Sequence, residues 1–175
     1  EAAVRLAPDA PETRFAQGRF AYACERSFEE ASRHYESAAR GLPNDPELLL
    51  QRGAVARRLG RNAEAATIIG RALEITPFDL SLAFIQVQTL RMLGRYAEAV
   101  AVADRLSGTV PLHSGVAQEV APARFEVDGN LERFKAALRA AEPSSRDSHG
   151  LDRDLRVAVL TGDLEEAERL VNDPR

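Results

Sequence analysis

A short pattern returns three times along this chain at a fixed spacing of 34 residues. The recurring positions are an alanine column (Ala31, Ala65, Ala99), a proline column (Pro43, Pro77, Pro111) and a Leu-Gly pair (Leu59-Gly60, Leu93-Gly94). Self-similarity at this period is typical of stacked helical hairpins, because no single hairpin buries its apolar face without a neighbour. The repeat therefore predicts an all-α array, and it favours a binding scaffold over a catalyst.

The second repeat carries clear signals for two helices joined by a tight turn. Asp45 is suited to cap a helix that begins at Pro46, because the fixed φ of proline fits the first helical position. Gly60 ends this helix, since glycine adopts the left-handed conformation at no steric cost. A second helix is expected over residues 62–75, and Asp79 then caps the first helix of the third repeat.

The first repeat departs from this plan at two positions. Arg26 stands at the turn where later repeats have glycine, and Gly18 lies one residue ahead of the column of Gly53. The run Ser27-Phe28-Glu29-Glu30 is a capping-box sequence, in which serine and glutamate satisfy each other's backbone donors. We therefore expect the first repeat to fold as a hairpin like the others.

The fourth repeat is degenerate. Pro122 falls inside the helix expected before the turn at Gly129, and a proline there removes a backbone bond and clashes with the preceding turn. A late start or a kink is expected in this helix. Residues 143–148 form the most loop-like stretch of the chain.

These signals divide the chain into one array with six segments. They are the tail of an earlier repeat (1–10), three repeats (11–45, 46–79 and 80–113), a degenerate repeat (114–147) and a partial repeat (148–175). The last segment ends at Asp173-Pro174-Arg175 without a polar capping helix. We therefore expect the array to be a piece of something longer.

The ladder of small and large residues resembles the tetratricopeptide repeat (TPR) family. In the second repeat the ladder falls on Leu49, Gly53, Ala56, Gly60, Ala65, Ile69, Ala72 and Pro77, and in the first repeat on Phe15, Tyr22, Phe28, Ala31, Tyr35, Ala38 and Pro43. The resemblance implies a right-handed superhelical α-solenoid of antiparallel hairpins. It also implies that the first helix of each hairpin lines a concave groove.

Composition and charge exclude several functions. A formal net charge of −4, with basic residues scattered among acidic ones, gives no electrostatic footprint for nucleic acid. No apolar stretch approaches the roughly 20 residues of a membrane span, and no secretory leader is visible. We expect a cytoplasmic protein with no membrane association. Because the chain opens with Glu1, a removed leader or a larger parent protein stays open.

No constellation of residues indicates catalysis, a metal or a cofactor. His34, His113 and His149 have no His, Cys or paired carboxylate one helical turn away, so we interpret all three as solvated. Cys24 is the only cysteine and is interpreted as a half-buried apolar side chain. Acidic clusters such as Glu29-Glu30 begin helices, where negative charge is stabilising. The sequence therefore predicts no enzyme activity, no metal site and no cofactor.

The candidate site is the exposed side of the first helices, where residues recur at three- and four-residue steps. The predicted ligand-contacting residues are Phe20, Leu50, Arg57, Arg58, Phe84, Gln88, Arg91 and Met92. Other members of this face are Ala16, Ala23 and Cys24 in the first repeat, Ala54 in the second, and Glu119, Ala123 and Glu126 in the fourth. An equally weighted alternative is that the two phenylalanines pack on neighbouring hairpins and the arginines are only wetted by solvent.

The chemistry of this face indicates a protein or peptide partner that is acidic and partly apolar. Arginine forms two-point contacts with carboxylates, and the apolar residues add buried area. The family's best-known mode, a clamp on the C-terminal carboxylate of chaperones, is not expected, because Ala16 and Phe20 replace its lysine and asparagine.

Two other roles stay open. The run from Leu6 to Glu12 also looks like linkers in arrays behind bacterial cyclase, kinase or regulator domains. The chain is then a regulatory or substrate-recruiting segment of a larger bacterial enzyme or signalling protein. The third role is structural, with exposed hairpin ends mediating self-association.

Overall fold

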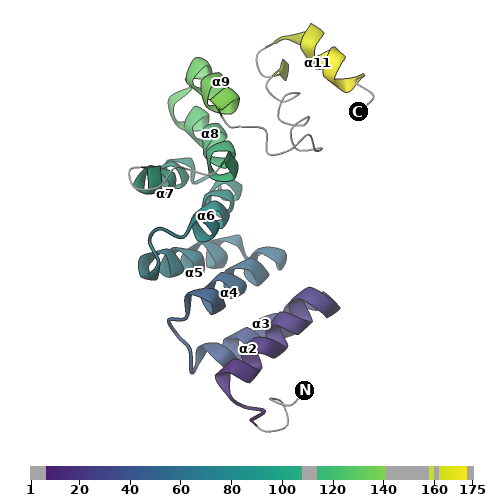
Figure 1. Cartoon of the computed structure of the whole chain (residues 1–175), viewed down its shortest axis with the longest axis vertical. Coiled ribbons are helices and arrows are strands. Elements are labelled where there is room, and N and C mark those ends of the chain that lie inside the picture. Colours follow the sequence, from purple (N-terminus) through teal and green to yellow (C-terminus); the bar gives the residue numbers. More distant parts are fainter. Residues whose placement is uncertain (1–6, 108–113, 141–157, 160–161, 173–175) are drawn as a thin grey trace. The chain divides into compact units, whose positions relative to one another are not determined.

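The structure, a computed structural model, describes residues 7–107, 114–140, 158–159 and 162–172 (Figure 1). In these ranges every regular element is a helix and no residue lies in a strand, so the predicted all-α class is confirmed. The chain divides into two compact units, Glu1–Arg95 and Tyr96–Arg175. Each unit is built from helices that pack on their neighbours in sequence.

The first unit contains the hairpins of the first two repeats and the first helix of the third. Its elements are α2 (Pro11–Phe20), the π-helix η1 (Ala21–Glu25), α3 (Phe28–Ala39), α4 (Pro46–Arg58), α5 (Asn62–Ile75) and α6 (Leu80–Met92). Helix α2 packs on α3, α3 on α4, α4 on α5 and α5 on α6, as the purple-to-teal ribbons show (Figure 1). The predicted helix over residues 62–75 is confirmed as α5.

Small residues allow the two helices of each hairpin to approach closely. Ala31 and Ala65 have no exposed surface. A Cβ atom on Gly53 would lie 2.4 Å from Ile69 Cγ1, and one on Gly18 would lie 2.5 Å from the ring of Tyr35. The alanine and glycine columns therefore mark where the helix backbones come together.

The helix ends form largely as the sequence predicts. Asp45 Oδ1 accepts a hydrogen bond from Leu48 N at 2.7 Å, and Asp79 Oδ1 accepts one from Leu82 N at 3.0 Å. Positive φ angles of 63° to 74° occur at four turn glycines, which are Gly60, Gly94, Gly129 and Gly162. Arg26 holds the same place in the first repeat with φ 54°, so it adopts the left-handed conformation without being a glycine.

The predicted capping box at Ser27 is wrong. Its side chain forms no capping hydrogen bond, although its backbone angles (φ −89°, ψ 86°) are close to those of Asp163 (φ −82°, ψ 78°), which does cap. The carboxylate of Asp163 accepts from Glu166 N at 3.1 Å.

The second unit contains α7 (Tyr96–Ser107), α8 (Ser114–Asp128), α9 (Leu131–Ala140) and α11 (Leu164–Val171). Helix α7 packs on α8 and α8 on α9, while Ala167 and Leu170 of α11 form a small cluster with Ala158. Of the late start or kink expected from Pro122, the late start is wrong, because α8 runs through the proline from Ser114, and the kink stays a prediction.

Several predicted features lie outside the described residues. They are the tail at residues 1–6, Pro111, His113, the loop at 143–148, His149 and the C-terminal residues 173–175.

Candidate functional site

The eight predicted ligand-contacting residues come from α2, α4 and α6, all within the first unit. We call their common surface the first-helix face, and define it as Phe20, Leu50, Arg57, Arg58, Phe84, Gln88, Arg91 and Met92. On α6 the last four residues follow one another at steps of four, three and one, which places them on one side of the helix. None of the eight is buried.

Arg57 joins the faces of α4 and α6. Its Nη2 atom donates a hydrogen bond to Gln88 Oε1 at 3.0 Å and lies 4.0 Å from Met92 Sδ. The guanidinium is thus held across the gap between two consecutive first helices. The structure brings these three predicted residues together.

Arg58, the next residue on α4, turns toward the first repeat instead. Its Nε atom donates to the Tyr22 hydroxyl at 3.4 Å, and this acceptor raises the pKa of the guanidinium. A second link joins α4 to α2, because Arg19 Nη1 lies 3.2 Å from Glu47 Oε1. Helix α4 therefore lies between α2 and α6 on this side of the unit.

Exposed apolar side chains flank the two arginines. Phe20 on α2 is 57% exposed and Met92 on α6 is 60% exposed. Leu50 and Phe84 are half-buried, so part of each side chain packs into the unit and part stays on the surface. The first-helix face therefore has a basic centre with apolar groups on both sides.

Some sequence interpretations of this region are corrected by the structure. Cys24 is exposed rather than half-buried, because it lies on the outer side of η1. His34 is half-buried, and its Nε2 atom lies 3.8 Å from Glu30 Oε1, one helical turn earlier. Ala123, placed on the exposed side of the fourth repeat, is fully buried.

The contact that the Tyr22 hydroxyl makes with Arg58 was not predicted from the sequence. Tyr22 belongs to the packing ladder, and its ring does lie 5.5 Å from that of Phe28, but its hydroxyl reaches Arg58. These two residues are 36 positions apart, so no local pattern could pair them.

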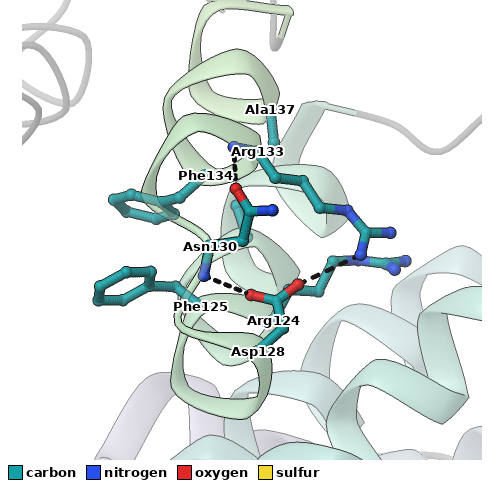
Figure 2. Close-up of a pocket in the computed structure, with 8 residues that line it drawn as sticks. Arg124, Phe125, Asp128, Asn130, Arg133, Phe134 and Ala137 are labelled. Atoms are coloured by element: carbon teal, nitrogen blue, oxygen red, sulfur yellow. Dashed lines mark hydrogen bonds and ion pairs between the residues drawn. The ribbon is translucent and has the colours of Figure 1, made fainter.

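A small pocket lies in the second unit, between α8 and α9 (Figure 2). Its volume is about 120 Å³, and its lining residues are Ala121, Arg124, Phe125, Asp128, Asn130, Arg133, Phe134 and Ala137. Figure 2 shows the rings of Phe125 and Phe134 together on one side, with centroids 5.4 Å apart. Arg133 and Asp128 lie on the other side.

The charged side chains that line this pocket are already in ion pairs. Arg133 Nη1 lies 3.2 Å from Asp128 Oδ2, and Arg124 forms an ion pair with Asp104 of α7. Phe134 lies five residues after the turn glycine Gly129, at the place that Ala65 and Ala99 hold after Gly60 and Gly94, and like them it is buried. The pocket is thus a consequence of the degenerate fourth repeat. A charged ligand would have to compete with the ion pairs that Arg124 and Arg133 already form.

Other kinds of site receive no support within the described residues. They contain no group of three or more His, Cys, Asp or Glu side chains placed to hold a metal ion. No helix among them is long and apolar enough to cross a lipid bilayer.

No protein-family model and no curated protein sequence matches this chain. Solved structures do match. MamA from Desulfovibrio magneticus is 19% identical, with 92% of this chain and 89% of that chain covered and a TM-score of 0.75. PilW, a type IV pilus biogenesis factor, is 16% identical, with 97% and 78% covered and a TM-score of 0.79. A TPR protein of Thermus thermophilus is 18% identical, with 92% and 88% covered and a TM-score of 0.70.

At these identities the likeness concerns the fold. The repeat period of 34 residues, the close helix packing at the small residues and the match to a solved TPR protein all agree. The chain therefore has the tetratricopeptide-repeat fold.

Proposed function

We propose that this chain is a protein-interaction module and that an acidic, partly apolar peptide segment binds across the first-helix face. The observation that carries the proposal is that two consecutive arginines of α4 reach opposite neighbours, Arg57 toward α6 and Arg58 toward η1, on a surface where Phe20 and Met92 are exposed. A peptide laid across the three helices meets an apolar, a basic and again an apolar group. Such a surface complements carboxylates flanked by apolar side chains.

The contacts of the two arginines support this reading. Arg57 is held by Gln88 and Met92, and Arg58 by the Tyr22 hydroxyl. Side chains held in place before binding lose less conformational entropy when a ligand arrives. A planar guanidinium suits two-point recognition of a carboxylate.

Within the described residues this segment has no catalytic role. Its described residues contain no group of side chains placed to hold a metal ion. The neighbours of known structure support the fold on which an interaction surface of this kind is built.

The test is selection from a displayed library of short random peptides on the immobilised chain. Enriched peptides are expected to carry Asp or Glu together with aromatic or aliphatic residues. Fluorescence anisotropy then measures their affinity for the wild type and for the Arg57→Glu/Arg91→Glu variant. We expect the double variant to abolish binding, and higher salt to weaken the binding of the wild type.

A matched control reverses the same number of charges on the second helices. Arg33 on α3 and Arg71 on α5 are both exposed, so Arg33→Glu/Arg71→Glu changes net charge equally without touching the first-helix face. This control is expected to bind peptides like the wild type, and circular dichroism should show both variants helical. Failure to enrich any peptide, or equal binding by both double variants, would refute the proposal.

A further inference from the structure

The segment formed by α2 and η1 contains one residue more than the corresponding segment of the second repeat, and backbone hydrogen bonds show it. The turn after α4 is closed by Arg61 N donating to Ala56 O at 2.8 Å, five residues back. In the first repeat Ser27 N donates to Ala21 O at 2.9 Å, six residues back. The π-helix η1 spans this wider closure, as a single inserted residue in an α-helix requires.

Glycine packing gives the same result independently. Gly18 packs on Tyr35 and Gly53 packs on Ile69, and the two partners are 34 residues apart. The glycines themselves are 35 apart. The extra residue therefore lies after Gly18 and before the turn.

The pattern of buried residues shows that the inserted residue is one of two. Gly18 and Ala21 are buried, as are the corresponding Gly53 and Val55. Between the first pair stand Arg19 and Phe20, whereas only Ala54 stands between the second pair. Both Arg19 and Phe20 are exposed, so the insertion places additional side chains on the outer surface of α2.

Arg19 is held by Glu47, which leaves Phe20 as the large apolar group that the insertion presents. An aromatic side chain that is 57% exposed gains free energy when a partner covers it. The insertion thus adds an aromatic ring beside the basic centre of the first-helix face, where the second repeat has only Ala54.

We infer that Phe20 is the apolar anchor of the partner peptide, and that it selects an aromatic or aliphatic residue about three positions from a carboxylate bound at Arg58. This inference rests on the proposed function. The spacing follows because packed helices lie about 8–10 Å apart and an extended chain advances about 3.3 Å per residue. Tyr22 and Arg58, in contact across α2–η1 and α4, fix the two helices beside each other.

The experiment uses one acid-containing peptide from the library selection and a second version with its apolar residue replaced by alanine. Affinities of both peptides are measured by anisotropy for the wild type, Phe20→Ala, Phe20→Leu and a deletion of Phe20. Phe20→Ala should weaken the first peptide about tenfold and leave the second unchanged, whereas Phe20→Leu should retain most of the affinity. The deletion should behave like Phe20→Ala.

Phe78→Ala is the matched control. Phe78 is 55% exposed, close to the 57% of Phe20, but lies in the turn before α6 and off the first-helix face. It should bind both peptides like the wild type. Thermal unfolding of each variant, including the deletion, checks that the helical fold persists.

The outcomes separate the two proposals. If Phe20→Ala and Phe78→Ala bind the first peptide with equal affinity while Arg57→Glu/Arg91→Glu abolishes binding, Phe20 is not the anchor and the proposed function stands. If the arginine variant also binds normally, the proposed function itself fails. A deletion variant that folds and binds the first peptide with wild-type affinity would likewise show that Phe20 is not the apolar anchor.

Discussion

Gly53 of α4 packs against Ile69 of α5 so closely that a Cβ atom on the glycine would lie 2.4 Å from Ile69 Cγ1. Gly53→Ala should therefore lower the free energy of unfolding by about 1–3 kcal/mol, through overpacking. Chemical denaturation of the variant measures this loss. In Gly70→Ala the new Cβ meets only Gln86 Nε2, at 3.5 Å, so we expect the helix-propensity gain of about 0.5–1 kcal/mol. Equal effects of the two variants would contradict the predicted contact.

Ala65 on the facing helix has no exposed surface, which predicts that a larger side chain is not tolerated there. Ala65→Leu should overpack the hairpin and destabilise it by roughly 1–3 kcal/mol. Ala63→Leu, on the exposed side of the same helix, should change stability little. Thermal unfolding of the pair tests the repeat register, and wild-type stability of Ala65→Leu would show that the register is wrong.

Arg26 adopts φ 54°, a conformation that costs an L-residue roughly 1–2 kcal/mol relative to glycine. Arg26→Gly should therefore raise the free energy of unfolding by about 1 kcal/mol, partly offset by the freedom that glycine adds to the unfolded chain. The reverse change, Gly60→Ala at φ 74°, should destabilise by a similar amount. Denaturant unfolding of both variants decides the matter, and a less stable Arg26→Gly would contradict the argument.

Tyr35 is fully buried, and no described residue forms a hydrogen bond with its hydroxyl. A buried polar group without a partner costs about 1–3 kcal/mol, so Tyr35→Phe should stabilise the protein at neutral pH by about 1 kcal/mol. Urea unfolding at pH 7 measures the gain. Tyr22→Phe, which removes a hydroxyl that Arg58 uses, should bring no such gain.

The same burial raises the pKa of Tyr35 to about 12 from the ordinary value of 10.0. Above pH 10 the unfolded chain releases this proton while the folded protein retains it, so the unfolded state is favoured as pH rises toward 12. The wild type should lose about 1.4 kcal/mol by pH 11 through this group, and Tyr35→Phe should not. Unfolding curves from pH 9 to pH 11 check this difference, and parallel curves for the two proteins would refute it.

Much of the fold follows from the sequence because its signals act locally. The cap at Asp45, the helix over residues 62–75 and the left-handed turn at Gly60 depend on backbone groups within a few residues. The alanine columns identify the buried side of each hairpin, because only small residues allow helices to approach closely. For the same reason, the displacement of Gly18 from the column of Gly53 already marks an irregularity in α2.

Only the tertiary structure decides how that irregularity is absorbed and what the first-helix face presents. The insertion becomes a π-helix because Gly18 must meet Tyr35 and Ala21 must stay buried, and these demands come from a facing helix. Arg57 pairs with Gln88 across 31 residues, and Arg58 with Tyr22 across 36. Sequence periodicity placed the arginines on one helix face, but contacts between residues so far apart depend on how neighbouring hairpins pack, which no local pattern encodes.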